Sequence, residues 1–294
     1  MDSAKNITRE MNENKPVFRS LYAKELPAIV SINDIIDAVI HGDCLDILKR
    51  IPSRSIDMIF IDPPYFLQLP RGKKLVRWYV RTIVESPEEE WDEFRSWREY
   101  DRFIEAVLRE ARRVMKPSAS MWAIGTYHNI HRIGKIMQDL GFWILNDVIW
   151  MKTNPMPNWL NVRLTNATEI LIWAVRDKDA REYTYNHDLA RSYSLKDFGS
   201  KIALNVWRIP IARGRERLRD EKGKRLHPTQ KPEELLERVI SISTKPGDII
   251  LDPMAGTGTT GVVARRLGRR FILIEREERY FRAIQQRLSI RDQN

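Results

Sequence analysis

The sequence predicts an α/β protein with a doubly wound, parallel β-sheet. From Ala38 onward, short apolar segments alternate with longer segments whose apolar residues recur at helical spacing. This alternation is typical of a parallel sheet covered by helices on both faces. Seven segments have the length and composition of strands, namely 39–41, 57–61, 121–124, 144–150, 170–175, 249–251 and 271–274.

The helices between these strands are predicted from apolar periodicity and from their end signals. Residues 100–115 place apolar side chains at helical spacing, and Lys116-Pro117 ends that pattern. Proline is tolerated in the first helical turn, so Pro232 opens a helix that runs to about Ser243. The remaining helices are expected at 129–140, after Gly258 and at 278–288.

The composition is that of a soluble globular protein with one main domain. Of the 294 residues, 43% are hydrophobic and 31% are charged, which excludes a disordered or fibrous class. We expect residues 1–36 to form an N-terminal extension and residues 37–294 to form the domain. The chain has no run of about 18 apolar residues and no signal-peptide pattern, which predicts a cytoplasmic protein with no membrane partner.

The net charge of +10 favours a polyanionic partner, although a basic protein can also be kept soluble by such a charge. Two basic segments interrupt the α/β rhythm, at 66–98 and 176–226. Long cationic loops that contain aromatic residues suit phosphate contacts and base stacking, while a solvated charged loop is the alternative. The candidate DNA-binding residues in these segments are Arg71, Lys73, Lys74, Arg77, Arg213, Arg215 and Arg217.

Asp62-Pro63-Pro64-Tyr65 directly follows the apolar strand predicted at 57–61. Such a turn delivers a carboxylate at the carboxyl end of a strand, where open α/β sheets bind ligands. The prolines fix the turn and leave backbone carbonyls as acceptors, beside the aromatic face of Tyr65. A nucleobase with an exocyclic amine would satisfy both features, whereas a turn in which Asp62 acts only as a cap is the alternative.

A glycine-containing turn, Asp252 to Thr260, follows another strand and opens a helix. Glu275 ends the next strand, at the position where ribose hydroxyls are bound in dinucleotide folds. The pattern Gly256, Gly258, Gly261 leaves NAD formally open. Asp252 would repel a pyrophosphate but can bind an ammonium group, which favours S-adenosylmethionine. The segment His227 to Pro232 leads into the helix at Pro232. Its hydroxyl, amide and ammonium groups, from Thr229, Gln230 and Lys231, could bind the carboxylate end of the same cofactor, or the segment could form a capping turn.

In this order, Asp62 to Tyr65, His227 to Pro232, Asp252 to Thr260 and Glu275 resemble the β-class DNA amino-methyltransferases. Further segments resemble the cell-cycle-regulated and HinfI-type adenine-N6 enzymes within that class, which act on GANTC. These segments are Trp91-Asp92, Tyr100-Asp101, 127–130, 140–147, 153–157 and 216–218.

The resemblance implies a circularly permuted, seven-stranded methyltransferase sheet with inserted DNA-recognition loops. In chain order, its strands are the third to the seventh, followed by the first and second. It implies that Asp62, Pro63, Pro64 and Tyr65 are catalytic, that Asp43 and Cys44 lie near the cofactor adenine, and that Asn154 contacts DNA. The other implied cofactor-binding residues are His227, Thr229, Lys231, Asp252, Met254, Ala255, Gly256, Thr257, Gly258, Thr259, Thr260 and Glu275.

Three features depart from that family. The C-terminal DNA-binding extension has no counterpart in this sequence, the N-terminal segment has none in the family, and Met254 stands where the family usually has Phe. The expected activity is methyl transfer from S-adenosylmethionine to N6 of adenine in double-stranded DNA. N4 of cytosine, or a non-catalytic DNA-binding module that senses the cofactor, are the alternatives. A homodimer and a cognate restriction endonuclease are possible partners.

Two motifs have other interpretations. Cys44 could suggest a cysteine nucleophile, but its position beside Asp43 favours a packing role. His128 and His131 have the spacing of metal ligands on a helix, yet no second pair of ligands accompanies them. The sequence therefore predicts no metal site.

Overall fold

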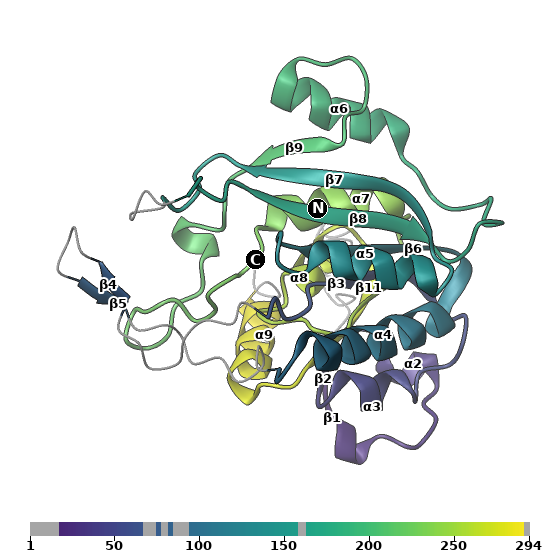
Figure 1. Ribbon diagram of the computed structural model, residues 1–294. Helices are drawn as coiled ribbons and strands as arrows, with labels where there is room; N and C mark the ends of the chain where they lie inside the picture. Colours follow the sequence, from purple (N-terminus) through teal and green to yellow (C-terminus); the bar gives the residue numbers. More distant parts are fainter. Residues whose placement is uncertain (1–17, 67–74, 78–81, 85–93, 158–162, 291–294) are drawn as a thin grey trace, which may run out of the picture.

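The computed structural model describes residues 18–66, 75–77, 82–84, 94–157 and 163–290. Within these residues, nine strands form one sheet in the order β1-β2-β11-β10-β3-β6-β8-β7-β9 (Figure 1). The strands are β1 Arg19–Tyr22, β2 Ala38–His41, β3 Ile56–Ile61, β6 Met115–Gly125, β7 Trp143–Lys152, β8 Thr168–Val175, β9 Val206–Ile209, β10 Ile249–Asp252 and β11 Arg270–Glu275.

All seven predicted strands are present, and their order confirms the permuted arrangement. The last two strands of the chain, β10 and β11, lie between β2 and β3 in the sheet. The count of seven was too low for this sheet, because β1 and β9 extend its two edges. β1 pairs with β2, and β9 pairs with β7. β1 has the sequence Arg-Ser-Leu-Tyr and no buried residue, and an exposed arginine interrupts β9, so neither shows the apolar run that identified the other strands.

The prediction of a parallel sheet is wrong at one strand. β8 pairs antiparallel with both of its neighbours, β6 and β7, whereas the other pairs of the large sheet are parallel. An antiparallel neighbour needs no crossover helix to connect it, and β8 begins at Thr168, soon after β7 ends at Lys152. Apolar periodicity does not encode strand direction, so the sequence pattern could not distinguish the two cases.

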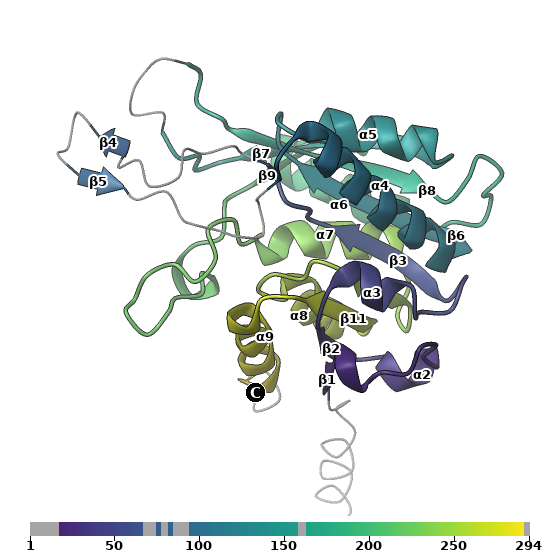
Figure 2. The same cartoon turned by 60° about the horizontal axis from the view of Figure 1, so that its bottom comes forward.

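Helices cover both faces of the sheet (Figures 1 and 2). One face packs against α3, α4 and α5, and the other packs against α7, α8 and α9. None of the helices among the described residues is both long and apolar enough to cross a bilayer. The helices are α2 Ile32–Ile35, α3 Cys44–Leu48, α4 Trp97–Val114, α5 Ile130–Asp139, α6 His187–Phe198, α7 Glu233–Ser243, α8 Thr259–Arg266 and α9 Glu278–Ile290, with 3-10 turns η1 Ala23–Glu25 and η3 Gly214–Glu216.

The two faces of the sheet form two separate hydrophobic clusters. In β3, Ile59 and Ile61 belong to the cluster under α4, while Phe60 belongs to the cluster under α7. This alternation follows from the two-residue period of a strand, and it explains why the central strands have nearly continuous apolar sequences. The buried strands hold their carboxyl ends rigidly at one edge of the sheet.

The N-terminal segment and the two predicted loops contribute to this architecture. In the segment 1–36, the described residues include β1 and three buried side chains, Val30, Ile35 and Ile36. Much of the 66–98 loop lies outside the described residues, apart from a short antiparallel hairpin of β4 Leu75–Arg77 and β5 Thr82–Val84. The segment 176–226 includes α6 and β9, and its later part projects on the same side of the molecule as the β4–β5 hairpin (Figures 1 and 2).

Candidate active site

A cavity of about 330 Å³ lies at the carboxyl ends of four adjacent parallel strands. The strand β3 leads into Asp62, β10 ends at Asp252, β11 ends at Glu275, and β2 leads into Asp43. Side chains that are far apart in the sequence meet here because these strands run in the same direction. This edge of an open α/β sheet is where such folds bind ligands.

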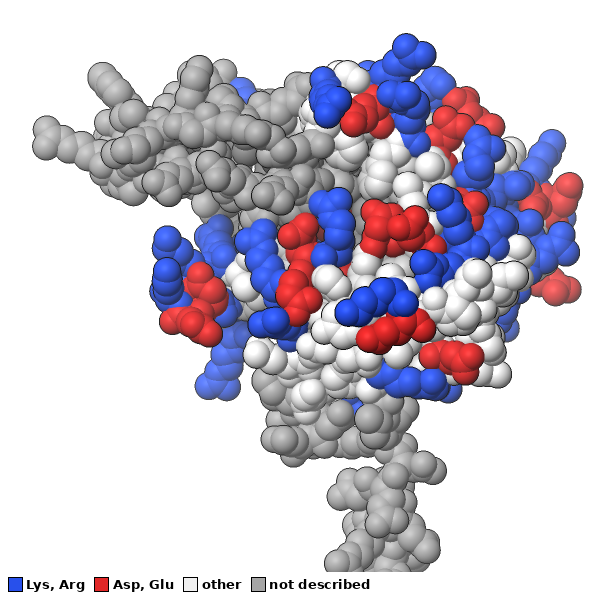
Figure 3. Space-filling model, turned by 90° about the horizontal axis from the view of Figure 1, so that it is seen from below, with Lys and Arg blue, Asp and Glu red and all other residues white. Residues whose placement is uncertain are grey.

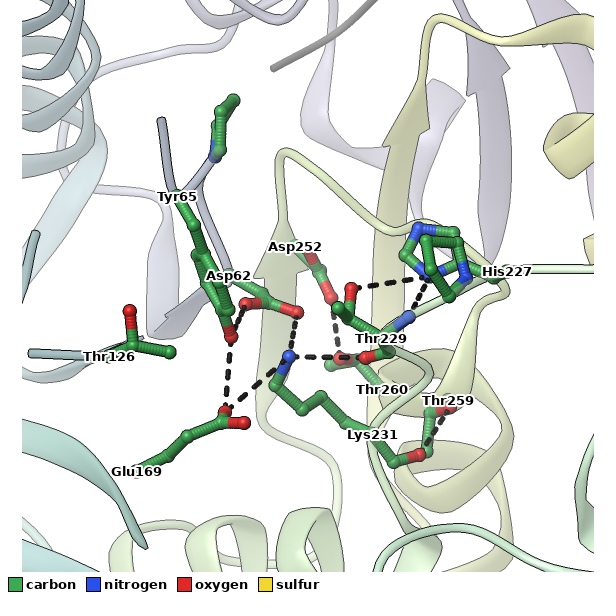
Figure 4. A network of polar contacts seen from close by, with 12 residues as sticks. Asp62, Tyr65, Thr126, Glu169, His227, Thr229, Lys231, Asp252, Thr259 and Thr260 are labelled. Atoms are coloured by element: carbon green, nitrogen blue, oxygen red, sulfur yellow. Dashed lines mark hydrogen bonds and ion pairs between the residues drawn. The ribbon is translucent and has the colours of Figure 1, made fainter. Parts of the chain in front are cut away.

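Asp62 makes two polar contacts at the base of this cavity (Figure 4). Its Oδ2 atom accepts a hydrogen bond from the Lys231 ammonium at 2.6 Å, and Oδ1 lies 3.0 Å from the Tyr65 hydroxyl. Lys231 also donates to the carbonyl of Thr229 at 3.2 Å, and its Nζ atom lies 5.1 Å from the centre of the Tyr65 ring. In this structure, Lys231 therefore binds the predicted catalytic carboxylate directly.

The turn that contains Asp62 is fixed by its surroundings. The Pro64 carbonyl accepts hydrogen bonds from the Tyr100 hydroxyl at 2.9 Å and from Asn129 Nδ2 at 3.2 Å. Phe66, the next residue after the motif, has a φ of 49°, which is unusual for a residue with a large side chain. Its ring packs against Trp97 with the ring centres 4.7 Å apart, and this packing holds the chain in its sharp change of direction.

Burial and neighbouring charges shift the pKa values of Asp62, Lys231 and Tyr65. Burial raises the pKa of the Asp62 carboxyl, and the Lys231 ammonium opposes that rise. Burial alone would lower the pKa of Lys231, but the Asp62 and Glu169 carboxylates outweigh it and raise that pKa. Burial and the same two carboxylates raise the pKa of Tyr65. Tyr65 is therefore a hydrogen-bond donor at neutral pH, and Lys231 is charged.

Glu169, at the start of β8, belongs to this network and was missed by the sequence analysis. Its Oε2 atom lies 3.1 Å from the Tyr65 hydroxyl and 3.8 Å from Lys231 Nζ. Its Oε1 atom pairs with Lys152 at 2.8 Å. The available signal was an acid and a lysine at the facing ends of two neighbouring strands, but the strand predicted at 170–175 begins one residue after Glu169 and leaves it out.

Two further buried carboxylates, those of Asp252 and Glu275, line the cavity. Asp252 accepts hydrogen bonds from the Thr260 hydroxyl at 2.5 Å and from the Met254 backbone at 3.1 Å. Glu275 accepts from the backbone N–H groups of Gly256 at 2.7 Å and Glu277 at 2.8 Å. Burial raises the pKa of Asp252 and that of Glu275 to about 7.

This set of donors and acceptors fits S-adenosylmethionine better than a dinucleotide. Two buried carboxylates would repel a pyrophosphate, whereas they can bind the ammonium group and the ribose hydroxyls of an amino-acid-bearing nucleoside. Gly256 lines the cavity with a φ of 52°, and a Cβ there would lie 3.5 Å from the His227 ring. The turn thus lets the backbone approach a ligand closely.

All but one of the predicted cofactor-binding residues line the cavity. Thirteen of the fourteen line the cavity, while Gly258 is not in the cavity wall; its φ is 73°, and a Cβ there would lie 2.8 Å from Ile284 of α9. His227 accepts a hydrogen bond from the Thr229 backbone at 3.2 Å, and burial lowers its pKa to about 3, so its ring is neutral. The thirteen in the wall are Asp43, Cys44, His227, Thr229, Lys231, Asp252, Met254, Ala255, Gly256, Thr257, Thr259, Thr260 and Glu275.

The wall beside Asp43 combines a helix cap with aromatic side chains. Asp43 caps α3 by accepting from the backbone of Leu45 at 2.9 Å. Burial raises the pKa of the Cys44 thiol to about 12, so it is not a reactive thiolate. Phe94, Phe103 and Tyr280 also line the cavity. We had assigned Phe103 to the core face of a helix, because helical spacing alone does not show where the core ends and a cavity begins.

The predicted DNA-binding residues fall into three groups. Arg71, Lys73 and Lys74 lie outside the described residues, and only the backbone of Arg77 is described, in β4. Arg213 and Arg215 are exposed, whereas Arg217 is 9% exposed and donates to the carbonyls of His227 at 3.3 Å and Pro228 at 2.8 Å. Asn154 accepts from the Ile211 backbone at 2.8 Å. In this structure the side chains of Arg217 and Asn154 therefore bind backbone groups of the protein itself.

The surface charge is mixed over the face seen in Figure 3. Lys and Arg side chains there lie beside Asp and Glu side chains, without a continuous patch of one sign. Exposed ion pairs such as Arg282–Glu278 on α9 are of this kind. The excess of positive charge therefore does not identify this face as a binding surface.

Comparison with known proteins supports the chemistry that this cavity suggests. Residues 56–286 match the DNA methylase family. The type II methyltransferase M.HinfI of Haemophilus influenzae is 46% identical over 261 residues, which cover 88% of this chain and 70% of that protein. The type II methyltransferase M2.DpnII of Streptococcus pneumoniae is 42% identical over 251 residues, which cover 85% of this chain and 88% of that protein.

Solved structures agree with these matches. The complex of M1.HpyAVI with S-adenosylmethionine has a TM-score of 0.60 at 27% identity, and the match covers 85% of this chain and 98% of that one. The cytosine-N4-specific PvuII DNA methyltransferase, with a TM-score of 0.63 at 20% identity and 85% of both chains covered, shares the fold. The cofactor is S-adenosylmethionine, and the chain belongs to the DNA methylase family of S-adenosylmethionine-dependent methyltransferases.

Proposed function

We propose that this protein transfers a methyl group from S-adenosylmethionine to the N6 amine of adenine in double-stranded DNA. The observation that carries the proposal is the position of Asp62 beside Tyr65 in the same cavity as Asp252 and Glu275. A carboxylate acceptor and an aromatic face suit an exocyclic amine and its base. The Asp252 and Glu275 carboxylates suit the cofactor.

The residues have separate roles in this proposal. Asp252 would bind the cofactor ammonium and Glu275 the ribose, while Met254 and the segment at Asp43 and Cys44 would contact its adenine. When bound, S-adenosylmethionine supplies an activated methyl carbon. Glycines and threonines from Gly256 to Thr260 would shape the cavity around the cofactor, together with His227 and Thr229.

Asp62 would act on the target amine. The lone pair of an aromatic amine is delocalised into its ring, so the amine is a weak nucleophile. Hydrogen bonds from the amine to the Asp62 carboxylate and the Pro63 carbonyl would favour a pyramidal nitrogen and localise the lone pair. Asp62 would also hold the proton that the nitrogen loses when it is substituted. No covalent bond to the protein is needed.

Base flipping would bring the amine to Asp62. Extrusion of the base from the duplex costs a few kcal/mol, and stacking on Tyr65 would offset roughly 1–3 kcal/mol of that cost. Arg213 and Arg215, on an exposed loop near the β4–β5 hairpin side of the molecule, would bind phosphates. The basic residues of the 66–98 loop would do the same.

The likeness to type II methyltransferases supports a role in restriction–modification. We propose a GANTC-like recognition site, a cytoplasmic location and a cognate restriction endonuclease as the partner enzyme. A homodimer would supply a second DNA-binding surface. Sedimentation of the active protein tests the dimer, and a monomer with full activity at nanomolar concentration would contradict it.

The reaction itself is tested with labelled S-adenosylmethionine and mixed-sequence duplex DNA, followed by digestion to nucleosides. Labelled N6-methyladenine is the expected product. Labelled N4-methylcytosine would replace the proposed base but keep the reaction, whereas absence of label with bound cofactor would favour a non-catalytic module. Duplexes that contain GANTC, compared with duplexes of permuted sequence, then test the recognition site.

A further inference from the structure

The arrangement of donors around Asp62 raises a problem for the incoming amine. In the free protein, both Asp62 oxygens already have partners: Tyr65 lies at Oδ1 and Lys231 at Oδ2. The Asp62 side chain is 18% exposed and that of Lys231 is 6% exposed, so water has little room to replace either partner. A target amine that binds Asp62 must therefore compete with one or both donors.

Glu169 provides a second acceptor for the same two donors (Figure 4). A tyrosine hydroxyl has one proton, so Tyr65 can donate either to Asp62 at 3.0 Å or to Glu169 at 3.1 Å, but not to both. Lys231 has three N–H groups, of which two are used by Asp62 and by the Thr229 carbonyl. Its Nζ atom lies 3.8 Å from the same Glu169 oxygen, Oε2, that faces Tyr65.

Glu169 lies where it can accept the hydrogen bonds of Tyr65 and Lys231 in place of Asp62. It is the second residue of β8 and is 8% exposed, and it does not line the cavity. Its other oxygen is bound by Lys152, whose side chain is 11% exposed. Lys152 thus holds the carboxylate in place, while the second oxygen stays directed at Tyr65 and Lys231.

We propose that Glu169 is a positioning residue that accepts hydrogen bonds from Tyr65 and Lys231 when the target amine binds Asp62. It makes no contact with the base or the cofactor. Its carboxylate takes over the two donors, so that Asp62 becomes available to the amine without leaving a buried cation or hydroxyl unpaired. This inference rests on the proposed transfer to an exocyclic amine.

The variant Glu169→Gln tests it, because glutamine keeps the size of the side chain but loses the negative charge that attracts Lys231. The first readout is the affinity for duplexes that carry either adenine or purine at the target position, since purine lacks only the amine. Wild type should prefer adenine, and Glu169→Gln should lose most of that preference. Affinity for S-adenosylmethionine should stay within about twofold of wild type, because Glu169 lies outside the cavity wall.

The second readout is a double-mutant cycle with Tyr65→Phe, measured by single-turnover methyl transfer. Glu169→Gln should lower the rate on the order of 10²-fold, the lower end of the loss that follows removal of one preorganised polar group. Tyr65→Phe should cost much less in the Glu169→Gln background than in wild type, because the two side chains share one hydrogen bond. Additive losses would contradict the exchange.

Two further variants separate this role from a structural one. Lys152→Gln combined with Glu169→Gln removes the buried pair without leaving a net charge; if Glu169 only neutralises Lys152, this double variant should regain the preference for adenine, and that result would overturn the proposal. Lys116→Gln is the matched control, because it removes a 2.7 Å ion pair with Asp57 in the same sheet, away from the cavity. It should bind and methylate DNA like wild type.

The base that the protein methylates is identified with the wild-type protein alone, independently of the Glu169 variants. If wild type labels cytosine, the same comparison uses cytosine and its analogue without the amine, and the Glu169 proposal is tested unchanged. An unaltered preference for the amine in Glu169→Gln overturns the proposal, whichever base wild type methylates.

Discussion

Lys231 Nζ lies 2.6 Å from Asp62 Oδ2, and this ion pair joins two motifs that are 169 residues apart in the sequence. The pair connects the turn after β3 with the segment before α7, across the cavity at the carboxyl edge of the sheet. We had assigned Asp62 to the target base and Lys231 to the cofactor. The contact shows that the two halves of the site share one electrostatic network.

We expect Asp62→Ala to lower the rate of methyl transfer on the order of 10² to 10³-fold, by analogy with the removal of one preorganised polar group. Affinity for S-adenosylmethionine should change little, because Asp252 and Glu275 remain. Single-turnover kinetics and equilibrium cofactor binding measure the two effects. Wild-type turnover in Asp62→Ala would remove Asp62 from the catalytic residues.

Tyr65→Ala and Tyr65→Phe separate stacking from hydrogen bonding. Loss of the ring should weaken capture of the flipped base, with a cost of roughly 1–3 kcal/mol. Tyr65→Phe keeps the ring and removes only the hydroxyl that Asp62 and Glu169 share, so its loss should be smaller. The measurement is kcat/KM for duplex DNA, and equal losses in both variants would argue against stacking.

Cofactor affinity should rise with pH between about 6 and 8. Burial raises the pKa of both Asp252 and Glu275 to about 7, so both carboxyls become charged over this range. A charged Asp252 attracts the cofactor ammonium, and a charged Glu275 is the stronger acceptor for the ribose hydroxyls. The gain is at most about tenfold per pH unit for each proton released. Titration calorimetry at several pH values measures it. Asp252→Asn should flatten the curve, while Asp248→Asn, at the other end of β10, should not.

The raised pKa values of Asp252 and Glu275 also make the free protein less stable as the pH rises. A carboxyl whose pKa is raised in the folded state stabilises that state below its unfolded pKa of about 4. This contribution is lost as the pH rises through about 7. The increase in melting temperature on addition of S-adenosylmethionine should therefore be larger at pH 8 than at pH 6. A smaller increase at pH 8 would contradict the assigned shifts.

The sequence was sufficient for features that depend on local pattern. Seven strands, the turn at Asp62 and the glycine turn at Gly256 follow from apolar runs and from residues with special backbone preferences. It was not sufficient for features that depend on which strands become neighbours. Glu169 reaches Tyr65 only because β8 inserts antiparallel between β6 and β7, and no residue in β8 encodes that direction.

Arg217 shows a second limit of sequence reasoning, because composition reveals a cation but not its burial. It resembles Arg213 and Arg215 in sequence, yet its guanidinium binds the carbonyls of His227, which lines the cavity, and of the adjacent Pro228. Arg217→Ala should weaken cofactor binding on the order of tenfold, since bonds from a charged donor contribute about 1.5–3 kcal/mol.

Arg215→Ala is the matched comparison. It should weaken DNA binding, reduce the salt dependence of that binding by about one phosphate contact, and leave cofactor binding unchanged. DNA titrations at several salt concentrations and cofactor calorimetry distinguish the two arginines. Equal effects of both substitutions on DNA and on cofactor would contradict their separate roles.

Arg238 of α7 is a fully buried cation that attaches α6 to the rest of the fold. Its side chain is 0% exposed, and it binds Asp197 at 2.5 and 3.0 Å and Glu234 at 2.9 Å. Arg238→Met would leave the Asp197 carboxylate, 4% exposed, without its cation. A buried pair broken in this way costs about 3–5 kcal/mol, which is a large share of the stability of an ordinary domain.

Urea unfolding measures this loss, with Arg266→Met as the control. Arg266 also pairs with two acids, Glu233 and Glu237, but its side chain is 38% exposed, so its loss should cost about 1 kcal/mol or less. Burial opposes ionisation of Asp197, yet its bonds with Arg238 and the Arg208 backbone lower its pKa. This stabilisation is present above the unfolded pKa and is lost as the pH falls through the lower folded value. Arg238→Met should remove most of that acid sensitivity, because the cation that lowers the pKa is gone. An equal loss in the free energy of unfolding in Arg238→Met and Arg266→Met would show that the burial of Arg238 does not increase its contribution to stability.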